Sequence, residues 1–131
     1  MIRPRATDED GTLAVLTATW LTALVVLVSL VAVDVGVLLR GARVAGAAAD
    51  GAALAAATAS RTSASVLPRT AADRIARAHG ATLVDCDCGG DPAEVAVTLP
   101  VDTRLLVHLG IVEVRAAATA TLVPVPDDHG G

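Results

Sequence analysis

An uninterrupted apolar stretch, residues 11–33, constrains this chain more than any other feature. It contains no charged side chain, and Asp10 and Asp34 lie at its two ends. About 20 apolar residues are enough for a helix to cross a bilayer. Its six Leu and six Val favour insertion by about 4–7 kcal/mol, at roughly 0.3–0.6 kcal/mol each. Each Ser or Thr hydroxyl can bond the carbonyl one turn back. The stretch therefore predicts a transmembrane helix, with membrane lipid as its partner.

The rest of the 131-residue chain can form only a small domain with a thin core. The whole chain contains no Phe or Tyr, and its single aromatic residue, Trp20, lies within the apolar stretch. Beyond residue 40 the apolar residues are mainly Ala and Val. Because aromatic side chains dominate core energetics, we expect the domain to depend on a partner. The formal net charge of −4 gives no basic patch for nucleic acid. No small-molecule substrate or enzymatic activity is indicated.

The residues from Asp34 to about Ser60 read as a continuation of the same helix. Ten of the residues 45–59 are Ala, the strongest helix former. Glycines recur every five residues at positions 36, 41, 46 and 51, where the helix can bend or another backbone can approach closely. Close helix packing in membranes uses such small residues. We therefore expect this Ala-rich segment to pack against a helix of another subunit rather than on its own domain.

The second half of the chain predicts one short helix and three strands. Pro68 can begin a helix that runs to His79, with Leu67, Ala71, Ile75 and Ala78 on one face and Gly80 as its stop. Alternating patterns then predict strands over 82–88, 94–101 and 112–123, with a turn over 89–92. Pro100 indicates that the second strand ends there or lies at an edge.

These elements predict an α+β fold: a long N-terminal transmembrane helix extended into an Ala-rich stalk, then a short helix and a small three-stranded antiparallel sheet. The expected organisation is a short N-terminal tail (1–11), the transmembrane helix with its Ala-rich extension (12–60), a small extracytoplasmic α+β domain (61–123) and a flexible tail (124–131).

The only two cysteines, Cys86 and Cys88, are predicted to share the apolar face of the first strand with Thr82 and Val84. Their Cα atoms would lie about 6.6 Å apart, at a rise of roughly 3.3 Å per residue, which is near the limit for a disulfide. Three alternatives stay open: buried small apolar residues, a disulfide between the two, or pairing with another subunit. The C-x-C spacing lacks the second ligand pair of a zinc site.

Asp85, Asp87 and Asp91, together with Gly90, resemble the beginning of a calcium-binding loop. The position of the bidentate Glu in such a loop is occupied by Ala96. We therefore expect a solvated hairpin face and no metal site.

Two segments resemble a known family. The first runs from Asp34-Val-Gly36 to Ala48-Ala-Asp50-Gly-Ala-Ala-Leu54-Ala-Ala-Ala57, and the second is the G-A-x-L-V-x-C of residues 80–86. Both are similar to segments of the TadE/TadG-like pilus-assembly proteins. The small size of the chain and the later segment also resemble the short TadE-like proteins of high-GC Gram-positive bacteria. The resemblance covers mainly residues 10–60. It implies a pilin-like, non-enzymatic subunit of a Flp-type pilus assembly or secretion apparatus, without a cofactor, whose partners are other membrane subunits of that apparatus. It also implies that the C-terminal domain lies outside the cell membrane, since the arginines flanking the span do not decide its orientation.

Processing of the N-terminus has two alternatives. Pilin-like proteins are cut after a Gly, with Glu five residues further on. If Gly11 is that Gly, Leu16 stands where Glu is expected, so we expect the N-terminus to be retained. Residues 45–47, Ala-Gly-Ala, also fit a signal-peptide cleavage site, but the apolar region is longer than the 7–15 residues of a signal core.

The expected helix-assembly surface consists of Asp34, Gly36, Gly46, Asp50, Ala53 and Leu54. Asp34 either makes a polar contact within the helix assembly or lies at the headgroup boundary. Asp50 either pairs with an Arg of a neighbouring subunit or is simply solvated. The alternative function is a stand-alone, membrane-tethered binding or sensor module outside the cell.

Overall fold

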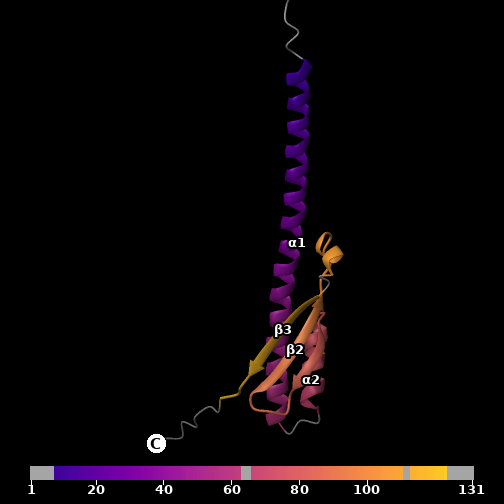
Figure 1. The fold of residues 1–131 in the computed structure, drawn as a ribbon. Coiled ribbons are helices and arrows are strands. Elements are labelled where there is room, and N and C mark those ends of the chain that lie inside the picture. The colour runs from indigo at the N-terminus through magenta and orange to yellow at the C-terminus, as the bar shows by residue number, and fades with distance from the viewer. Residues whose placement is uncertain (1–7, 63–65, 111–112, 124–131) are drawn as a thin grey trace, which may run out of the picture.

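A computed structural model describes residues 8–62, 66–110 and 113–123. Helix α1 (Asp8–Arg61) precedes a compact unit made of helix α2 (Pro68–Ala78), strands β1 (Thr82–Asp87), β2 (Ala93–Pro100) and β3 (Glu113–Ala120), and a short 3-10 helix, η1 (Leu106–Leu109). The two helices cover one face of the sheet (Figure 1). The predicted α+β class, with one long helix, one short helix and a three-stranded antiparallel sheet, is confirmed. The predicted tail 124–131, most of the predicted tail 1–11 and the strand position Val112 lie outside the described residues.

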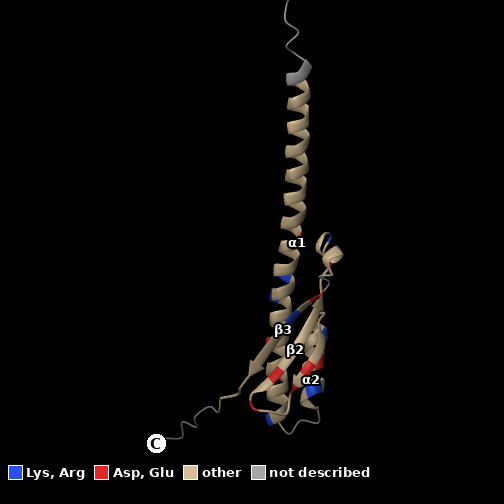
Figure 2. Ribbon diagram, viewed as in Figure 1, with Lys and Arg blue, Asp and Glu red and all other residues tan. Residues whose placement is uncertain are grey.

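The N-terminal half of α1 projects away from the rest of the molecule. Leu13 is 61% exposed and Trp20 is 77% exposed, and no charged residue lies between residues 11 and 33 (Figure 2). As expected, Thr17, Thr22 and Ser29 donate their hydroxyl protons to carbonyls one turn back, at 2.8–3.0 Å. Among the described residues α1 is the one helix long and apolar enough to cross a membrane, so it fits a single-pass membrane anchor.

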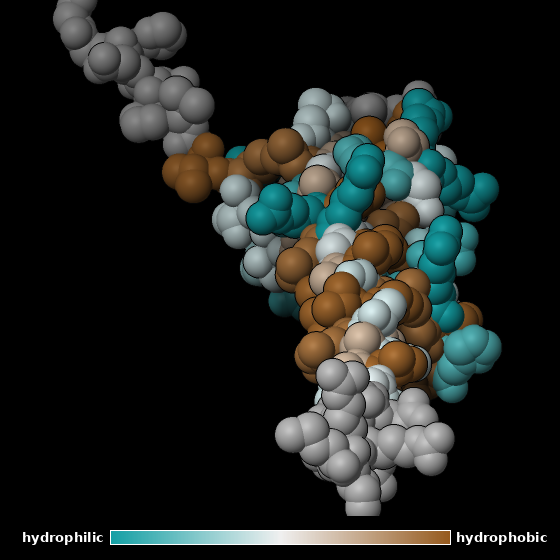
Figure 3. Space-filling view, turned by 90° about the horizontal axis from the view of Figure 1, so that it is seen from above, coloured by the Kyte–Doolittle hydropathy of each residue, from teal (hydrophilic) through white to brown (hydrophobic). Residues whose placement is uncertain are grey.

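The C-terminal half of α1 packs on its own domain, which differs from the expected packing against another subunit. Seven of its alanines are buried: Ala45, Ala48, Ala49, Ala52, Ala53, Ala56 and Ala57. All of them except Ala45 meet Val95 and Val97 of β2 and the alanines of α2 in one core. Small side chains make this possible, because they let the sheet approach the helix backbone and bury apolar surface without aromatic residues. Seen from above, hydrophobic residues fill the middle of the view and hydrophilic residues lie mainly towards its edges (Figure 3).

Two of the four glycines that recur every five residues on α1 lie where neighbouring elements come close to the helix. A Cβ atom at Gly41 would lie 2.6 Å from Cγ1 of Val101, and one at Gly51 would lie 3.1 Å from Cγ2 of Ile75. A Cβ at Gly36 or Gly46 would meet nothing within 4 Å. Gly41 and Gly51 therefore make room for neighbouring side chains of the same chain, whereas the space beside Gly36 and Gly46 is unoccupied.

Helix α2 begins at Pro68 and is followed by Gly80, which has a φ of +75°, as the sequence predicts. The buried face of α2 is not the face shared by Leu67, Ala71, Ile75 and Ala78. Ala72 and Ala76 are buried, whereas Leu67 is 72% exposed and precedes the helix. Ala72 and Ala76 share one core with the alanines of α1, and the larger Ile75 lies half-buried, against Gly51.

The sheet has the order β1-β2-β3, with both pairs antiparallel. Val95 and Val97 of the central strand point into the core and are 2% and 1% exposed. Pro100 is the last residue of β2 and pairs with Glu113, so the prediction that the strand ends there is confirmed. β3 alternates as predicted, with half-buried residues at even positions from Val114 to Ala120.

A bulge in β1 changes which side chains face the core. Leu83 pairs with Val97 and Asp85 pairs with Ala96, so Val84 is the extra residue. Leu83 and Cys86 are half-buried, and Val84 is 49% exposed. The prediction that Thr82 and Val84 share the face of the cysteines was therefore wrong, because one inserted residue reverses the alternation before it.

Candidate functional site

Asp34 of α1 binds the connection between β2 and β3. Its carboxylate is 1% exposed and accepts three backbone hydrogen bonds, from the amides of Arg104 (2.9 Å), Leu105 (2.6 Å) and Leu106 (3.0 Å). These residues lie about 70 positions further along the chain. Asp34 thus ties the connection between β2 and β3 to the helix, directly after the apolar stretch 11–33. Neither alternative considered from the sequence, a polar contact within the helix assembly or a position at the headgroup boundary, includes this contact with the chain's own domain.

The same contacts set the protonation of Asp34. The hydrogen bond from the Arg104 amide is the largest influence. Together with the amides of Leu105 and Leu106 and the positive charge of Arg104, it outweighs burial and lowers the pKa of Asp34 below its ordinary value of 3.8. The carboxylate is therefore charged at neutral pH, and its charge strengthens the three hydrogen bonds.

The residues of the expected helix-assembly surface divide into two groups. Asp34 and Ala53 face the domain and are buried. Gly36, Asp50 and Leu54 are exposed on the opposite side of α1, where Leu54 is 54% exposed, and Gly46 is half-buried between the two sides. Of these six residues, Gly36, Asp50 and Leu54 are exposed to another subunit, and Gly46 lies at the edge of that exposed side.

An apolar groove runs between α1 and α2 on the side away from the sheet. It encloses about 490 Å³, and Gly51, Leu54 and Ile75 are among the residues that line it. Leu54 therefore belongs to both the exposed side of α1 and this groove.

The structure joins Cys86 and Cys88 by a disulfide, with their Cα atoms 5.1 Å apart. Cys86 lies opposite Val95 in the ladder, and Cys88, directly after β1, is 6% exposed. The Cα distance is shorter than the 6.6 Å expected for a regular strand because the chain leaves the ladder after Asp87. Of the three alternatives, the structure has the pairing within the chain.

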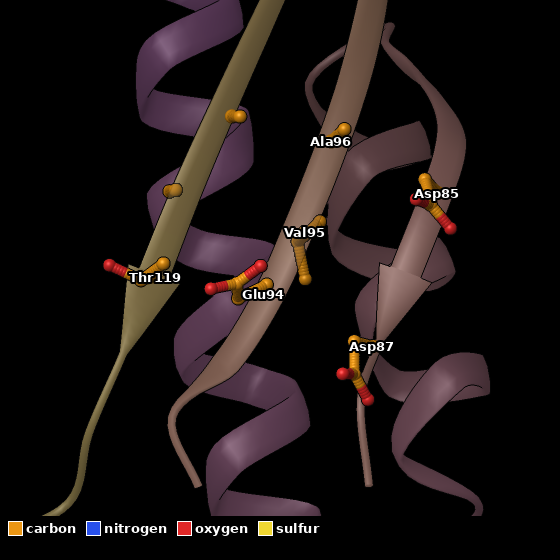
Figure 4. A pocket seen from close by; sticks show the side chains of 8 residues that line it. Asp85, Asp87, Glu94, Val95, Ala96 and Thr119 are labelled. Carbon is orange, nitrogen blue, oxygen red and sulfur yellow. The ribbon is translucent and has the colours of Figure 1, made fainter. Parts of the chain in front are cut away.

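The outer face of the sheet carries an acidic depression of about 300 Å³. Asp85 and Asp87 of β1 and Glu94 of β2 border it, and Thr119 lies on the far side (Figure 4). Asp87 lies directly opposite Glu94 in the ladder. No group of three or more His, Cys, Asp or Glu among the described residues is placed to hold a metal ion. The calcium-like spacing thus lies on an open sheet face.

Arg61 joins the end of α1 to two distant segments, a role that the sequence analysis did not identify. Its guanidinium donates to the carbonyl of Leu122 and lies 3.5 Å from the carboxylate of Asp91, in the turn between β1 and β2. An arginine at the last turn of a helix is a common C-terminal signal, but its partners are set only by the fold.

Comparison with models of known protein families, with curated proteins and with solved structures found no match to this chain.

Proposed function

We propose that this chain is a non-enzymatic, single-pass membrane subunit of the TadE-like, pseudopilin-like type, which acts by helix–helix assembly in a Flp-type pilus assembly or secretion apparatus. The observation that carries the proposal is the division of α1. One half is an exposed apolar rod, and the other half is the core helix of a small domain. Such a chain couples a bilayer span rigidly to a domain outside it.

The contacts of Asp34 support an anchor that is retained rather than a signal peptide that is removed. Cleavage within residues 45–47 would remove Asp34, with its three hydrogen bonds to the domain, and Gly41, which lies against Val101. A domain that uses these residues would lose them with the leader. The intact mass of the membrane-extracted protein tests this, and a mass that corresponds to a start at Ala48 would overturn it.

The exposed residues of α1 support assembly through helices. The side of α1 opposite the domain carries Gly36, Arg43, Asp50 and Leu54, and it continues directly into the apolar stretch. Small residues let the backbones of two helices approach closely. A neighbouring helix can therefore approach along Gly36 and Gly46, where side-chain space is open, and Arg43 and Asp50 can pair with the opposite charges of a second helix.

Gly36→Leu and Gly46→Leu test the assembly surface. Both variants should strengthen the helix itself, by about 0.8–1 kcal/mol, because Leu is a much better helix former than Gly. Both should nevertheless reduce crosslinking and co-purification with the pilus or secretion subunits, since the added side chains keep a neighbouring helix at a distance. Complexes and pilus or secretion output that stay unchanged in both variants would contradict the proposal.

Ala117→Leu is the matched control and also tests the alternative function. Ala117 is exposed and lines the acidic depression on the outer face of the sheet, far from the exposed side of α1. If the chain is instead a tethered binding module, the acidic depression is its candidate ligand surface. In that case Ala117→Leu, and not the glycine variants, should impair function.

A further inference from the structure

The connection between β2 and β3 rises along α1 towards the apolar stretch. Its two ends, Val101 and Val114, both lie against Gly41, at 2.6 and 3.6 Å from the position of a Cβ there. The amides of Arg104–Leu106 instead bind Asp34, seven residues nearer the N-terminus. At a rise of about 1.5 Å per residue this is a climb of about 10 Å. Figure 1 shows this segment standing above the end of the sheet, beside α1.

This segment, residues 104–110 (the membrane-proximal loop), exposes large apolar side chains at its far end. Leu109 is 74% exposed and Val107 is 42% exposed, whereas Leu105 and Leu106 are half-buried. Arg104, at the base of the loop, is exposed and positively charged. The hydrogen bonds to Asp34 hold these apolar side chains at the level where the apolar stretch ends.

We propose that the membrane-proximal loop is a second membrane contact, which inserts Leu109 and Val107 into the interfacial layer of the bilayer where α1 leaves it. The proposal rests on the membrane anchor proposed above. The 23 residues of the stretch 11–33 span about 34 Å as a helix, close to the roughly 30 Å of a hydrocarbon core. Asp34 then lies at the boundary of that core, and the loop bound to it lies among the phospholipid headgroups.

The chemistry of the loop fits this occupant. Apolar side chains at an interface are buried about 5–10 Å deep at the boundary between headgroups and acyl chains, which removes Leu109 from water. Arg104 is placed to meet the phosphate groups. Asp34 satisfies three loop amides that would otherwise have to find water close to the hydrocarbon. The domain would thus be held to the bilayer at two points, α1 and the loop, which limits its tilt.

Tryptophan fluorescence tests the proposal, because Trp20 is the only aromatic residue in the chain. In a Trp20→Leu background, Leu109→Trp places a reporter on the loop. Leu67→Trp is the matched control: Leu67 is 72% exposed, like Leu109 at 74%, but it lies beyond the C-terminal end of α1, about 40 Å from Asp34 at 1.5 Å per helical residue. Both full-length variants are reconstituted into phosphatidylcholine–phosphatidylglycerol vesicles with and without brominated acyl chains. Because both sites are exposed, both variants should fold, and equal unfolding temperatures check this.

The expected result is quenching of the Leu109→Trp emission by about twofold or more, as for a residue at interfacial depth, with the Leu67→Trp emission unchanged. The unsubstituted chain, with Trp20 in the span, reports on the anchor in the same vesicles. If Trp20 is not quenched, the proposed anchor fails. If Trp20 is quenched and Leu109→Trp is quenched no more than Leu67→Trp, the loop proposal is overturned and the anchor stands.

Discussion

Gly41 and Gly46 lie five residues apart on the same helix, yet alanine should have opposite effects at the two positions. Replacing Gly by Ala inside a helix normally raises stability by about 0.8–1 kcal/mol. At Gly46 nothing lies within 4 Å of the new Cβ, so Gly46→Ala should show this full gain. At Gly41 the new Cβ would lie 2.6 Å from Cγ1 of Val101, closer than carbon atoms can approach.

The size of the effect at Gly41 follows from how little Val101 can yield. Val101 is half-buried, its χ1 is stiff because it is β-branched, and Val114 lies on the same side, 3.6 Å from the Cβ position. Overpacking of this kind costs about 1–3 kcal/mol. After the helix-propensity gain, the free energy of unfolding of Gly41→Ala should be unchanged or lower by up to about 2 kcal/mol, and it should lie about 1–3 kcal/mol below that of Gly46→Ala.

Thermal unfolding of the full chain in detergent micelles measures this difference. A gap of 1 kcal/mol corresponds to about 4–8 °C for a domain of this size. The double variant Gly41→Ala/Val101→Ala isolates the contact: in the Val101→Ala background, Gly41→Ala should become stabilising, with a coupling energy of about 1–2 kcal/mol. If Gly41→Ala stabilises the chain as much as Gly46→Ala does, Val101 does not lie against the helix, and the placement of the loop above it is wrong.

Three further predictions concern Asp34 and the cysteines. Asp34→Asn removes the charged acceptor, so hydrogen exchange of the amides of residues 104–106 should accelerate by about tenfold or more. Asp50→Asn, at an exposed position, should leave this exchange unchanged. Equal exchange in the two variants would show that Asp34 does not hold the loop. Because the pKa of Asp34 is lowered in the folded chain, the contribution of Asp34 to stability should be complete above about pH 4 and be lost as the pH falls through the folded pKa, below 3.8. NMR shifts of the same amides should report this transition. If the transition persists in Asp34→Asn, it belongs to another group. Finally, a membrane-impermeant maleimide applied to intact cells after mild reduction should label Cys86 and Cys88 in loosened protein, and labelling only after lysis would place the domain inside.

Much of the architecture follows from local patterns along the sequence. Twenty-three uncharged residues predict a span, because backbone groups in a bilayer must be bonded within a helix. The alanine content predicts that this helix continues to about Ser60, and it ends at Arg61. Pro68 and Gly80 bound α2 through their own backbone restrictions. The period-two patterns of β2 and β3 identify the core-facing residues, since alternate side chains of a strand point to opposite faces.

The tertiary structure decided the features that depend on distant contacts. The sequence shows that residues 45–57 are mostly small, but it does not show whether a neighbouring subunit or the chain's own sheet covers them. The sheet covers them, because the small side chains let the strands approach the helix closely enough to form a core with Val95 and Val97. The bulge at Val84 arises in pairing with β2 and reverses the faces predicted for the start of β1. In the sequence, Asp34 is the residue that ends the apolar stretch. Only the fold brings its carboxylate within 3 Å of amides about 70 residues away. A buried carboxylate needs such hydrogen-bond donors, because burying a charge without partners is costly.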